Sequence, residues 1–514
     1  MVMALSGIGV GGPVGAYSLA PTPATKVAST IDTARMPAPS PAAVLSLTSA
    51  PQSVITLTLG NPTPENVVYG KLAAPNSNSL VWATPPADDV SQMMEAYLNV
   101  PAKSAAFSSL FGGLGAQLLD RLNKPQGDFR QAVVASQDPS GNGADDINAA
   151  AGAAIVQNAQ YAQNKIGLKI HTVSGKEVDL SITFGGDGHT IRDSLSIDVH
   201  TSGKLSADEQ TAVAKLAKGF DAALQGITSD STKVDVSGLV NYDTTVLSGV
   251  DLKVRESPQA GGLQSLDFHA DASRRSFAMQ GQAGVVSVSV NLSAPALWGS
   301  AAQQQTSVQR YLDQFDAANK RGHGGATLSG QFKDAFAQLN SSYPVPGQQP
   351  APALAASALN TQDRSVLSGL ADFQASMSGD WNNGSAGHIT TEGGHIDYQA
   401  SQQTGTRGVA KRTGLSVVQT QAATLGASFA KSRDGSPLDI VKGNYDIHSF
   451  NDSASTSTSF EYADDKLKSA TVINLVNQSE IYEKLVNHNM VEQKSTPHSI
   501  FTMQDISTQL RPTL

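Results

Sequence analysis

The chain has 514 residues, a formal net charge of -9 and no cysteine. This length suffices for two or three domains with their own apolar cores, so a single small domain is excluded. Charged residues make up only 15% of the chain, which argues against a nucleic-acid partner because phosphate neutralisation needs clustered Lys and Arg, and the lack of cysteine excludes disulfides and thiol chemistry.

The first 88 residues are expected to form a disordered tail rich in Pro, Ala and Ser. Twelve of the 24 prolines lie in residues 1–86, and proline interrupts helix and sheet because it fixes φ and lacks an N–H donor. One exception is SVITLTLG at 53–60, whose alternation predicts a short strand.

Signals for targeting are sparse. No basic residue precedes Lys26, so the charged start of a secretory signal is missing. No segment holds the run of about 18 apolar residues that spans a bilayer. We therefore expect a soluble protein without a transmembrane segment, which stays in the cytoplasm or is exported without a cleavable signal peptide.

Residues 89–165 are expected to be helical. DDVSQMMEAYLNV, KSAAFSSLFGGLGAQLLDRLNK and ADDINAAAGAAIVQNAQYAQNK each show helical spacing of apolar residues. Pro101, Pro125 and Pro139 separate these pieces, as is typical of helix boundaries.

The pattern then changes to strands with one apolar face. IGLKIHTV, KEVDLSITF and DSLSIDVH alternate apolar and polar residues, which predicts a three-stranded meander over 166–200. Ser206 and Glu209 form a capping box, in which each side chain satisfies a backbone N–H at a helix start. The helix that follows carries Val213, Leu216 and Phe220 on one face and ends at Gly226.

The same order of elements recurs. LQSLDFHADA, RRSFAMQG and GVVSVSVNL predict three strands, followed by a helix with Tyr311 and Phe315. A third version has the strands YDIHSF, STSFEYADD and LKSATVIN, followed by a helix over SEIYEKLVNHN. We interpret this as a recurring unit of three strands and a helix, which buries the apolar sheet face under its own helix; the alternative is a chance alternation of common elements.

The Pro-rich stretch YPVPGQQPAPALAAS predicts a linker at 346–357, followed by a helix at about 360–376. Residues 386–430 read as strands that are polar on both faces and that need a partner for order. The predicted fold class is α+β, with antiparallel β-meanders each followed by a packing helix, after a helical segment and a disordered N-terminal tail. The predicted divisions are 1–88 (tail), 89–165 (helical segment), 166–345 (central α+β domain with two βββα-like units), 346–357 (linker) and 358–514 (β-rich domain).

Two glycine-rich motifs are candidates for cofactor binding. GGDGH at 185–189 is close to the GGDGT phosphate-binding turn of lipid and NAD kinases, but a strand rather than a helix follows it, which favours a hairpin turn. GIGVGG makes Gly7, Gly9 and Gly12 candidates for dinucleotide binding, with Asp32 at the expected distance. Because Pro13 and later prolines leave no room for the required helix, we predict a flexible segment and no cofactor.

Candidate metal ligands are equally isolated. Asp138, Ser140 and Asn142 stand where a calcium loop places its first ligands, but Ala149 occupies the position of the bidentate glutamate. The alternative is a loop that ends in a helix N-cap at Asp145, so we predict no metal site.

The histidines form no obvious ligand set either. His171 and His200 fall on the polar face of the first meander and His189 in its turn, where solvated side chains are the expectation. His388 and His395 flank TTEGG, with Glu392 between them, and lack a third ligand.

Four segments, GLKIHTVSGKEVDLSITF, KLSADEQTAVAKLAKGFDAAL, LSGVDLKV and SAAQQQTSVQRYLDQFDAANKRGH, resemble a family of proteobacterial proteins of roughly this length. The resemblance covers about residues 90–345 and implies no activity. Members are sometimes labelled lactate dehydrogenase, but the residues above supply neither a Rossmann core nor a histidine and arginine placed for hydride transfer.

The sequence favours a bacterial, non-enzymatic interaction or structural protein with a protein partner. The alternative is an enzyme, either an NAD-dependent dehydrogenase built on GIGVGG or a hydrolase with a dispersed site. No catalytic residue can be assigned, because the chain has no GxSxG, HExxH or GxxxxGK[ST] motif.

Overall fold

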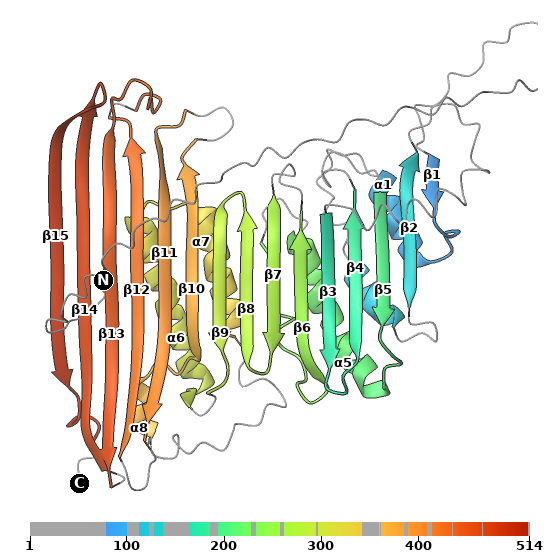
Figure 1. The fold of residues 1–514 in the computed structure, drawn as a ribbon, viewed down its shortest axis with the longest axis horizontal. Helices are drawn as coiled ribbons and strands as arrows, with labels where there is room; N and C mark the ends of the chain where they lie inside the picture. Colours follow the sequence, from blue (N-terminus) through green and yellow to red (C-terminus); the bar gives the residue numbers. More distant parts are fainter. Residues whose placement is uncertain are drawn as a thin grey trace, which may run out of the picture. The chain divides into compact units, whose positions relative to one another are not determined.

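The computed structural model describes residues 79–99, 113–122, 128–136, 164–185, 194–227, 233–256, 262–294, 297–341, 359, 361–384, 389–408, 414–433, 435–464 and 466–511. The described part forms one antiparallel sheet of fifteen strands with helices behind it (Figure 1). None of its helices has the length and apolarity needed to cross a bilayer.

The strands are β1 (Ser79–Trp82), β2 (Phe129–Ser136), β3 (Asn164–Thr172), β4 (Glu177–Phe184), β5 (Ser194–Thr201), β6 (Leu247–Arg255), β7 (Leu263–Asp271), β8 (Arg274–Gly281), β9 (Gly284–Asn291), β10 (Asp372–Asn382), β11 (Glu392–Arg407), β12 (Leu415–Lys431), β13 (Asp446–Ala463), β14 (Lys466–Val486) and β15 (Asn489–Asp505). The helices are α1 (Asp89–Asn99), α3 (Leu114–Arg121), α5 (Ala207–Ile227), α6 (Ala301–Arg321), α7 (Ala326–Leu339) and α8 (Thr361–Val366).

The strand order is β1-β2-β5-β4-β3-β6, followed by β7 to β15 in chain order. The chain leaves the sheet after β5, forms α5 and returns as β6 beside β3. Gly219 of α5 lies against the backbone of Gly238 in that return segment, where a Cβ on Gly219 would come within 2.6 Å of it. From β6 onward, each strand pairs with the strand that follows it in the chain.

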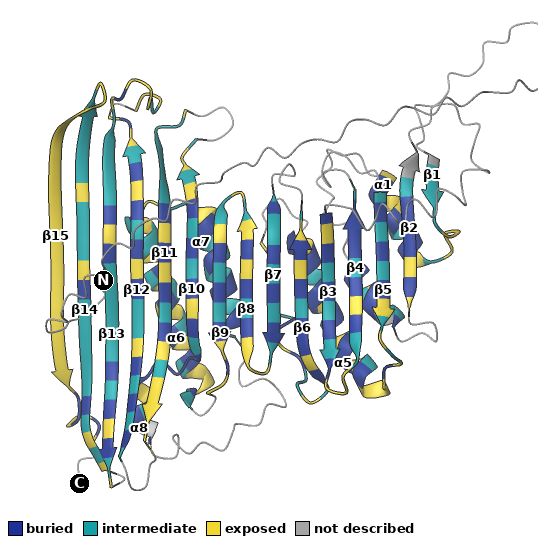
Figure 2. Ribbon diagram, viewed as in Figure 1, coloured by how far each residue is buried: buried dark blue, intermediate teal, exposed yellow. Residues whose placement is uncertain are grey.

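Side chains alternate between the two faces of the sheet, as they must in a strand. Leu168 and Ile170 of β3 are fully buried against the helices, whereas Lys169 and His171 between them are partly exposed. Figure 2 shows this banding along most strands. The hydrophobic core therefore lies between the sheet and the helices, and the other face carries the polar side chains.

Helices α6 and α7 cover the middle of the sheet with an aromatic cluster. Phe315 of α6 and Phe336 of α7 lie with ring centroids 5.0 Å apart. Phe336 also contacts Phe373 of β10 at 5.0 Å. Farther along the sheet, Arg321 at the end of α6 pairs with the largely buried Asp452 of β13. These contacts tie the helical layer to strands on both sides of β11.

A buried arginine contacts the C-terminal end of α7. Arg275 of β8 is 1% exposed, and its guanidinium donates to the backbone carbonyls of Leu339 (2.9 Å) and Ser341. Carbonyls at a helix C-terminus lack partners within the helix and carry partial negative charge. The arginine therefore satisfies groups that burial would otherwise leave unpaired.

The first two predicted units are confirmed at the level of their elements. β3, β4 and β5 precede α5, and β7, β8 and β9 precede α6. The third unit is wrong, because the predicted helix at 479–489 is the end of β14 and the turn into β15. Pairing with β13 on one side and β15 on the other outweighs the local helical pattern there.

Other differences come from pairing with distant strands. β2 forms inside the predicted helical segment, because FRQAVVAS pairs with β5 and β1. Of the helix predicted at 360–376, only α8 (Thr361–Val366) forms, and the last residues of this range belong to β10 (Asp372–Asn382). β10 pairs with β9 across the predicted linker, so the sheet is continuous where the sequence predicted a boundary. The domain division stays a prediction.

The prediction that residues 386–430 are polar on both faces was wrong. Ile396 and Tyr398 of β11 and Leu425 and Phe429 of β12 are buried beneath the helical layer. Small residues between them, such as Ala400 and Ala427, are also buried. Their low hydrophobicity hid the alternation from a reading based on large apolar residues.

The capping box at the start of α5 is confirmed and extends into the neighbouring turn. The backbone N–H of Ser206 donates to Glu209 Oε2 (2.7 Å), and Lys176 Nζ donates to the same oxygen (2.7 Å). Burial alone would raise the pKa of Glu209, but hydrogen bonds from Lys176, Ser174 and Ser206 outweigh it and lower this pKa to about 2. Glu209 thus fixes α5 to the β3–β4 turn.

We predict that Glu209→Gln lowers the free energy of unfolding at pH 7 by about 1–3 kcal/mol. The ionised carboxylate stabilises the fold fully above its unfolded pKa of about 4.5, and this stability is lost as the pH falls toward about 2. Urea denaturation between pH 7 and pH 3 should therefore show a weaker acid dependence in the variant. Asp208→Asn, an exposed change in the same helical turn, is the control. Equal losses for both variants would contradict the role assigned to Glu209.

Candidate functional site

The open face of the sheet carries two clusters of charged side chains. The first crosses β4, β3, β6 and β7, which are neighbours in that order. The second lies on β10 and β11. Both arise from strand alternation, which directs every second side chain away from the helices.

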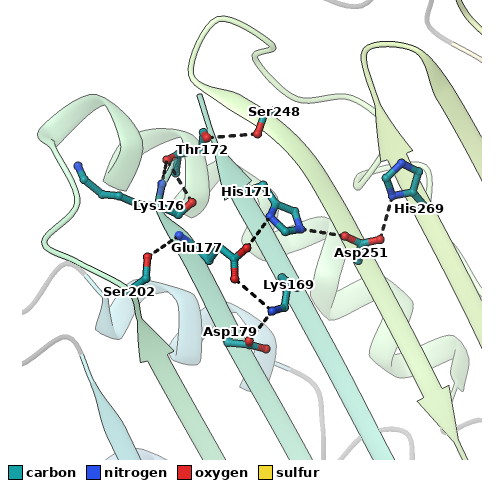
Figure 3. A network of polar contacts seen from close by, with 10 residues as sticks. All are labelled: Lys169, His171, Thr172, Lys176, Glu177, Asp179, Ser202, Ser248, Asp251 and His269. Carbon is teal, nitrogen blue, oxygen red and sulfur yellow. Dashed lines mark hydrogen bonds and ion pairs between the residues drawn. The ribbon is translucent and has the colours of Figure 1, made fainter. Parts of the chain in front are cut away.

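The first cluster is a row of alternating acidic and basic groups, shown in Figure 3. Lys169 contacts Asp179 (2.9 Å) and Glu177 (3.2 Å). His171 Nδ1 lies 3.3 Å from Glu177, and His171 Nε2 lies 3.0 Å from Asp251. Hydrogen bonds to Asp179 and Glu177 raise the pKa of Lys169, so this side chain stays charged.

The row continues through a second histidine. His269 Nδ1 lies 2.9 Å from Asp251, and His269 Nε2 lies 3.0 Å from Asp271. Burial would raise the pKa of Asp271, but hydrogen bonds from Ser273, His269 and Arg274 hold it below its ordinary value. Both ring nitrogens of each histidine therefore face carboxylates, and neither ring has a free nitrogen for proton transfer to a substrate.

A hollow of about 790 Å³ opens beside this row. Arg130, Lys165, Asp179, Asp198 and His200 contribute to its lining. Arg130 Nε donates to Asp198 (2.7 Å) across the β2–β5 pair. Arg130 and Asp198 of this lining thus pair with each other, and the hollow opens on the same face as the charged row.

The second cluster centres on His395 of β11. Its Nδ1 lies 2.7 Å from Asp380 of β10, and its Nε2 lies 3.0 Å from Asp397. Ser378 Oγ lies 3.5 Å from the same Nε2. The hydrogen bond with Asp380, supported by Asp397, raises the pKa of His395 above its usual value of 6.5.

Part of the open face between β9 and β12 has an uncharged lining. A second hollow of about 430 Å³ is lined there by Ser, Gln, Thr and Ala, namely Ser287, Ser289, Gln374, Ala375, Ser376, Gln399, Ala400, Ser401, Ala422, Ala423 and Thr424. Hydroxyl and amide groups both donate and accept hydrogen bonds. This region can therefore pair with polar groups of either kind without any ion to desolvate.

Several candidates from the sequence lie outside the described residues. These are the dinucleotide candidates Gly7, Gly9, Gly12 and Asp32, the calcium candidates Asp138, Ser140 and Asn142, and the histidines His189 and His388. The GGDGH turn is described only at Gly185, and β4 and β5 on its two sides pair antiparallel. The strand predicted after this turn is confirmed.

The remaining histidines are placed by the structure. His171 and His200 lie on the predicted polar face, but each contacts different carboxylates, Asp251 and Glu177 for the first and Asp128 for the second. Within the described residues, no three His, Asp or Glu side chains are arranged to hold a metal ion.

The carboxylates that contact His269 and His395 were not identified from the sequence. Asp267, His269 and Asp271 alternate along β7, and His395 and Asp397 do so along β11. Spacing of two residues places such groups on one face, so this signal was present in the sequence. The strand register was not, and it is the register that places Asp251 and Asp380 opposite the two histidines.

Comparisons with protein-family models, curated proteins and solved structures found no match to this chain.

We predict that Asp380→Asn lowers the pKa of His395 toward 6.5, because the largest contribution to its elevation is the hydrogen bond with Asp380. The imidazole resonances of His395, followed by NMR between pH 5 and 9, measure this change. Because Asp380 is exposed, added salt should shrink the difference between native and variant chains. Glu95→Gln, an exposed change on α1, should leave this titration unchanged.

Proposed function

We propose that this chain is a non-enzymatic interaction protein that binds a protein partner through the polar face of its sheet. The observation that carries this proposal is the one-sided arrangement of the described helices, all of which lie behind the sheet (Figure 1). A sheet that buries one face and exposes the other is ordinarily an antiparallel sheet with a solvated side. Here that side extends across fifteen strands.

The chemistry of this face supports a macromolecular partner. Its centre offers hydroxyl and amide groups on backbone held by hydrogen bonds to strands on both sides. Groups fixed in this way lose little entropy on binding, which favours association. In the described part of this face, Lys169, His171 and His269 contact carboxylates, so the charged row has mixed sign, unlike the clustered basic surface that nucleic acid requires.

The hollows on this face differ from small-molecule sites. Enzyme and ligand sites are usually clefts lined mainly by apolar groups that surround the ligand. The two hollows on the open face are wide open, and most of the residues that line them are of polar types. A partner with a matching polar surface would fill them more completely than a small substrate.

The proposed function fits both locations predicted from the sequence. Low charge and abundant Ser, Thr and Gly suit a protein in the cytoplasm and one exported without a cleavable signal. The proposed binding face serves in either compartment.

We predict that the double variant Gln399→Arg and Thr424→Arg loses the partner. These exposed residues are directly opposite each other on β11 and β12, so two like charges would enter the interface together. Burying two unpaired guanidinium groups in the interface costs several kcal/mol, and recovery should fall at least about tenfold. Co-purification from the cells that naturally produce the chain, quantified by mass spectrometry, measures this.

The matched control is Gln305→Arg, an exposed change on α6 behind the sheet. The partner must be retained by this control and lost by the double variant. If both variants recover the same proteins as the native chain, the open face is not the binding surface.

One observation favours a second candidate, a hydrolase. Ser378, His395 and Asp380 contact each other in the order of a nucleophile, a base and an orienting carboxylate. Asp397 competes for the nitrogen that would accept the serine proton, and the raised pKa of His395 favours its protonated form, which cannot act as a base. The dehydrogenase alternative rests on residues outside the described part, and a dinucleotide-binding fold requires a parallel sheet, whereas the described pairs are antiparallel.

If the hydrolase candidate holds, the native chain should cleave an activated ester such as p-nitrophenyl acetate, and Ser378→Ala should abolish the cleavage. The rate should rise with pH as His395 loses its proton. Ser376→Ala, two residues away on the same face of β10, is the control. Cleavage that survives Ser378→Ala unchanged would eliminate this candidate.

A further inference from the structure

The sheet ends in a long strand with one open side. β15 is the last strand of the sheet and pairs with β14. All of its residues are exposed, as the yellow strand in Figure 2 shows. The N–H and C=O groups that point away from β14 have no neighbouring strand in the described part of the chain. An edge of this kind is a template for another strand.

Pro497 divides this edge into two halves of different character. The half from Asn489 to Thr496 carries Glu492 and Lys494. Edge charges and proline are the features by which proteins protect an edge from pairing. Residues 498–504, HSIFTMQ, contain no Asp, Glu, Lys, Arg, Pro or Gly. Protection is therefore present in the first half and missing from the second.

The unprotected half also carries exposed apolar side chains. Phe501 is 55% exposed and Met503 is 63% exposed. They lie opposite Leu475 and Ile473 of β14, which share their face of the sheet. These four residues form an apolar patch that reaches the free edge, and burying it would be favourable.

We propose that two copies of this chain pair through residues 499–505 of β15, antiparallel and about a two-fold axis at Thr502. Phe501 then lies opposite the partner's Met503, and Asp505 lies opposite the partner's Ser499. The apolar patches of the two copies meet at the axis. The polar faces of both sheets point the same way, so the dimer presents one sheet of twice the width.

Backbone geometry selects this register. Proline is accommodated in an edge strand with its nitrogen turned to the open side, so residues separated from Pro497 by an even number share that orientation. Ser499, Phe501, Met503 and Asp505 therefore present their N–H and C=O groups to a new strand; the irregularity in the β14–β15 pairing lies elsewhere, at Lys484. A two-fold axis at Thr502 brings these four residues opposite the same four of the second copy, which is the requirement for paired hydrogen bonds.

A second copy fits this edge for two further reasons. No two carboxylates become opposed, since Asp505 is the single charged residue in the segment. Pro497 stays outside the new ladder, whereas a register with complete overlap of the two β15 strands would place two prolines opposite each other. Pairing of identical edges closes after two copies, which explains how a long edge can remain compatible with a defined assembly.

The cysteine-free chain allows a direct test of the register. Thr502→Cys places two thiols at the axis, where opposed Cα atoms in a non-hydrogen-bonded pair lie about 4.5 Å apart, within reach of a disulfide. Under mild oxidation this variant should form a covalent dimer at least about tenfold faster than Val491→Cys. Val491 is 56% exposed on the same strand but has no opposite residue in the proposed register, so it is the matched control. Equal rates would overturn the proposal.

The unmodified chain gives an independent measurement. Analytical ultracentrifugation of the full chain should show a concentration-dependent dimer at micromolar concentration, as expected for an interface of modest size. Met503→Lys should shift it to monomer, and so should Phe501→Pro, whose missing N–H would face the open edge and spare the β14 ladder. Met490→Lys removes an equally exposed apolar residue from the protected half and should remain dimeric. A native chain that is monomeric at about 100 µM would overturn the proposal.

Discussion

The alternation of side chains about one continuous hydrogen-bonded ladder is the constraint on which the rest of the molecule depends. Leu168 and Lys169 are neighbours in the chain, yet one is in the core and the other is in the charged row. A slip of one residue in any strand would exchange these environments. The hydrophobic core, the polar face and the edge of β15 are therefore fixed together by one register.

Different interactions stabilise the two parts of the sheet. Near β3 and β6 the strands are short, mainly apolar on their buried face and covered by α5. Strands β13 to β15 are twice as long and extend beyond the aromatic cluster of α6 and α7. There, Asp452 accepts hydrogen bonds from Arg321, Gln478 and the backbone of Ser479. Polar contacts and backbone pairing thus replace part of the hydrophobic burial.

Local sequence patterns predicted the type of most elements well, but they did not predict which strands pair with each other. The strands around Leu168 and Val288 and the capping box at Ser206 were readable, because period-two alternation and helix capping are local properties. The helix predicted at Ile481 failed because β13 and β15 impose a strand from outside the segment. The charged row was unreadable for the same reason: Asp251 of β6 reaches His171 through the pairing of β6 with β3, which is far away in the chain, and His269 through the register of β6 with β7.

Strand order has a consequence for how the molecule forms. From β10 to β15, each strand pairs with the strand just before it in the chain across a short connection, so these closures are local and entropically inexpensive. The pairings of β2 with β5, of β3 with β6 and of β9 with β10 instead join segments separated by whole elements. The part of the sheet from β10 to β15 can thus form strand by strand, whereas the rest of the sheet needs contacts between segments that are distant in the chain.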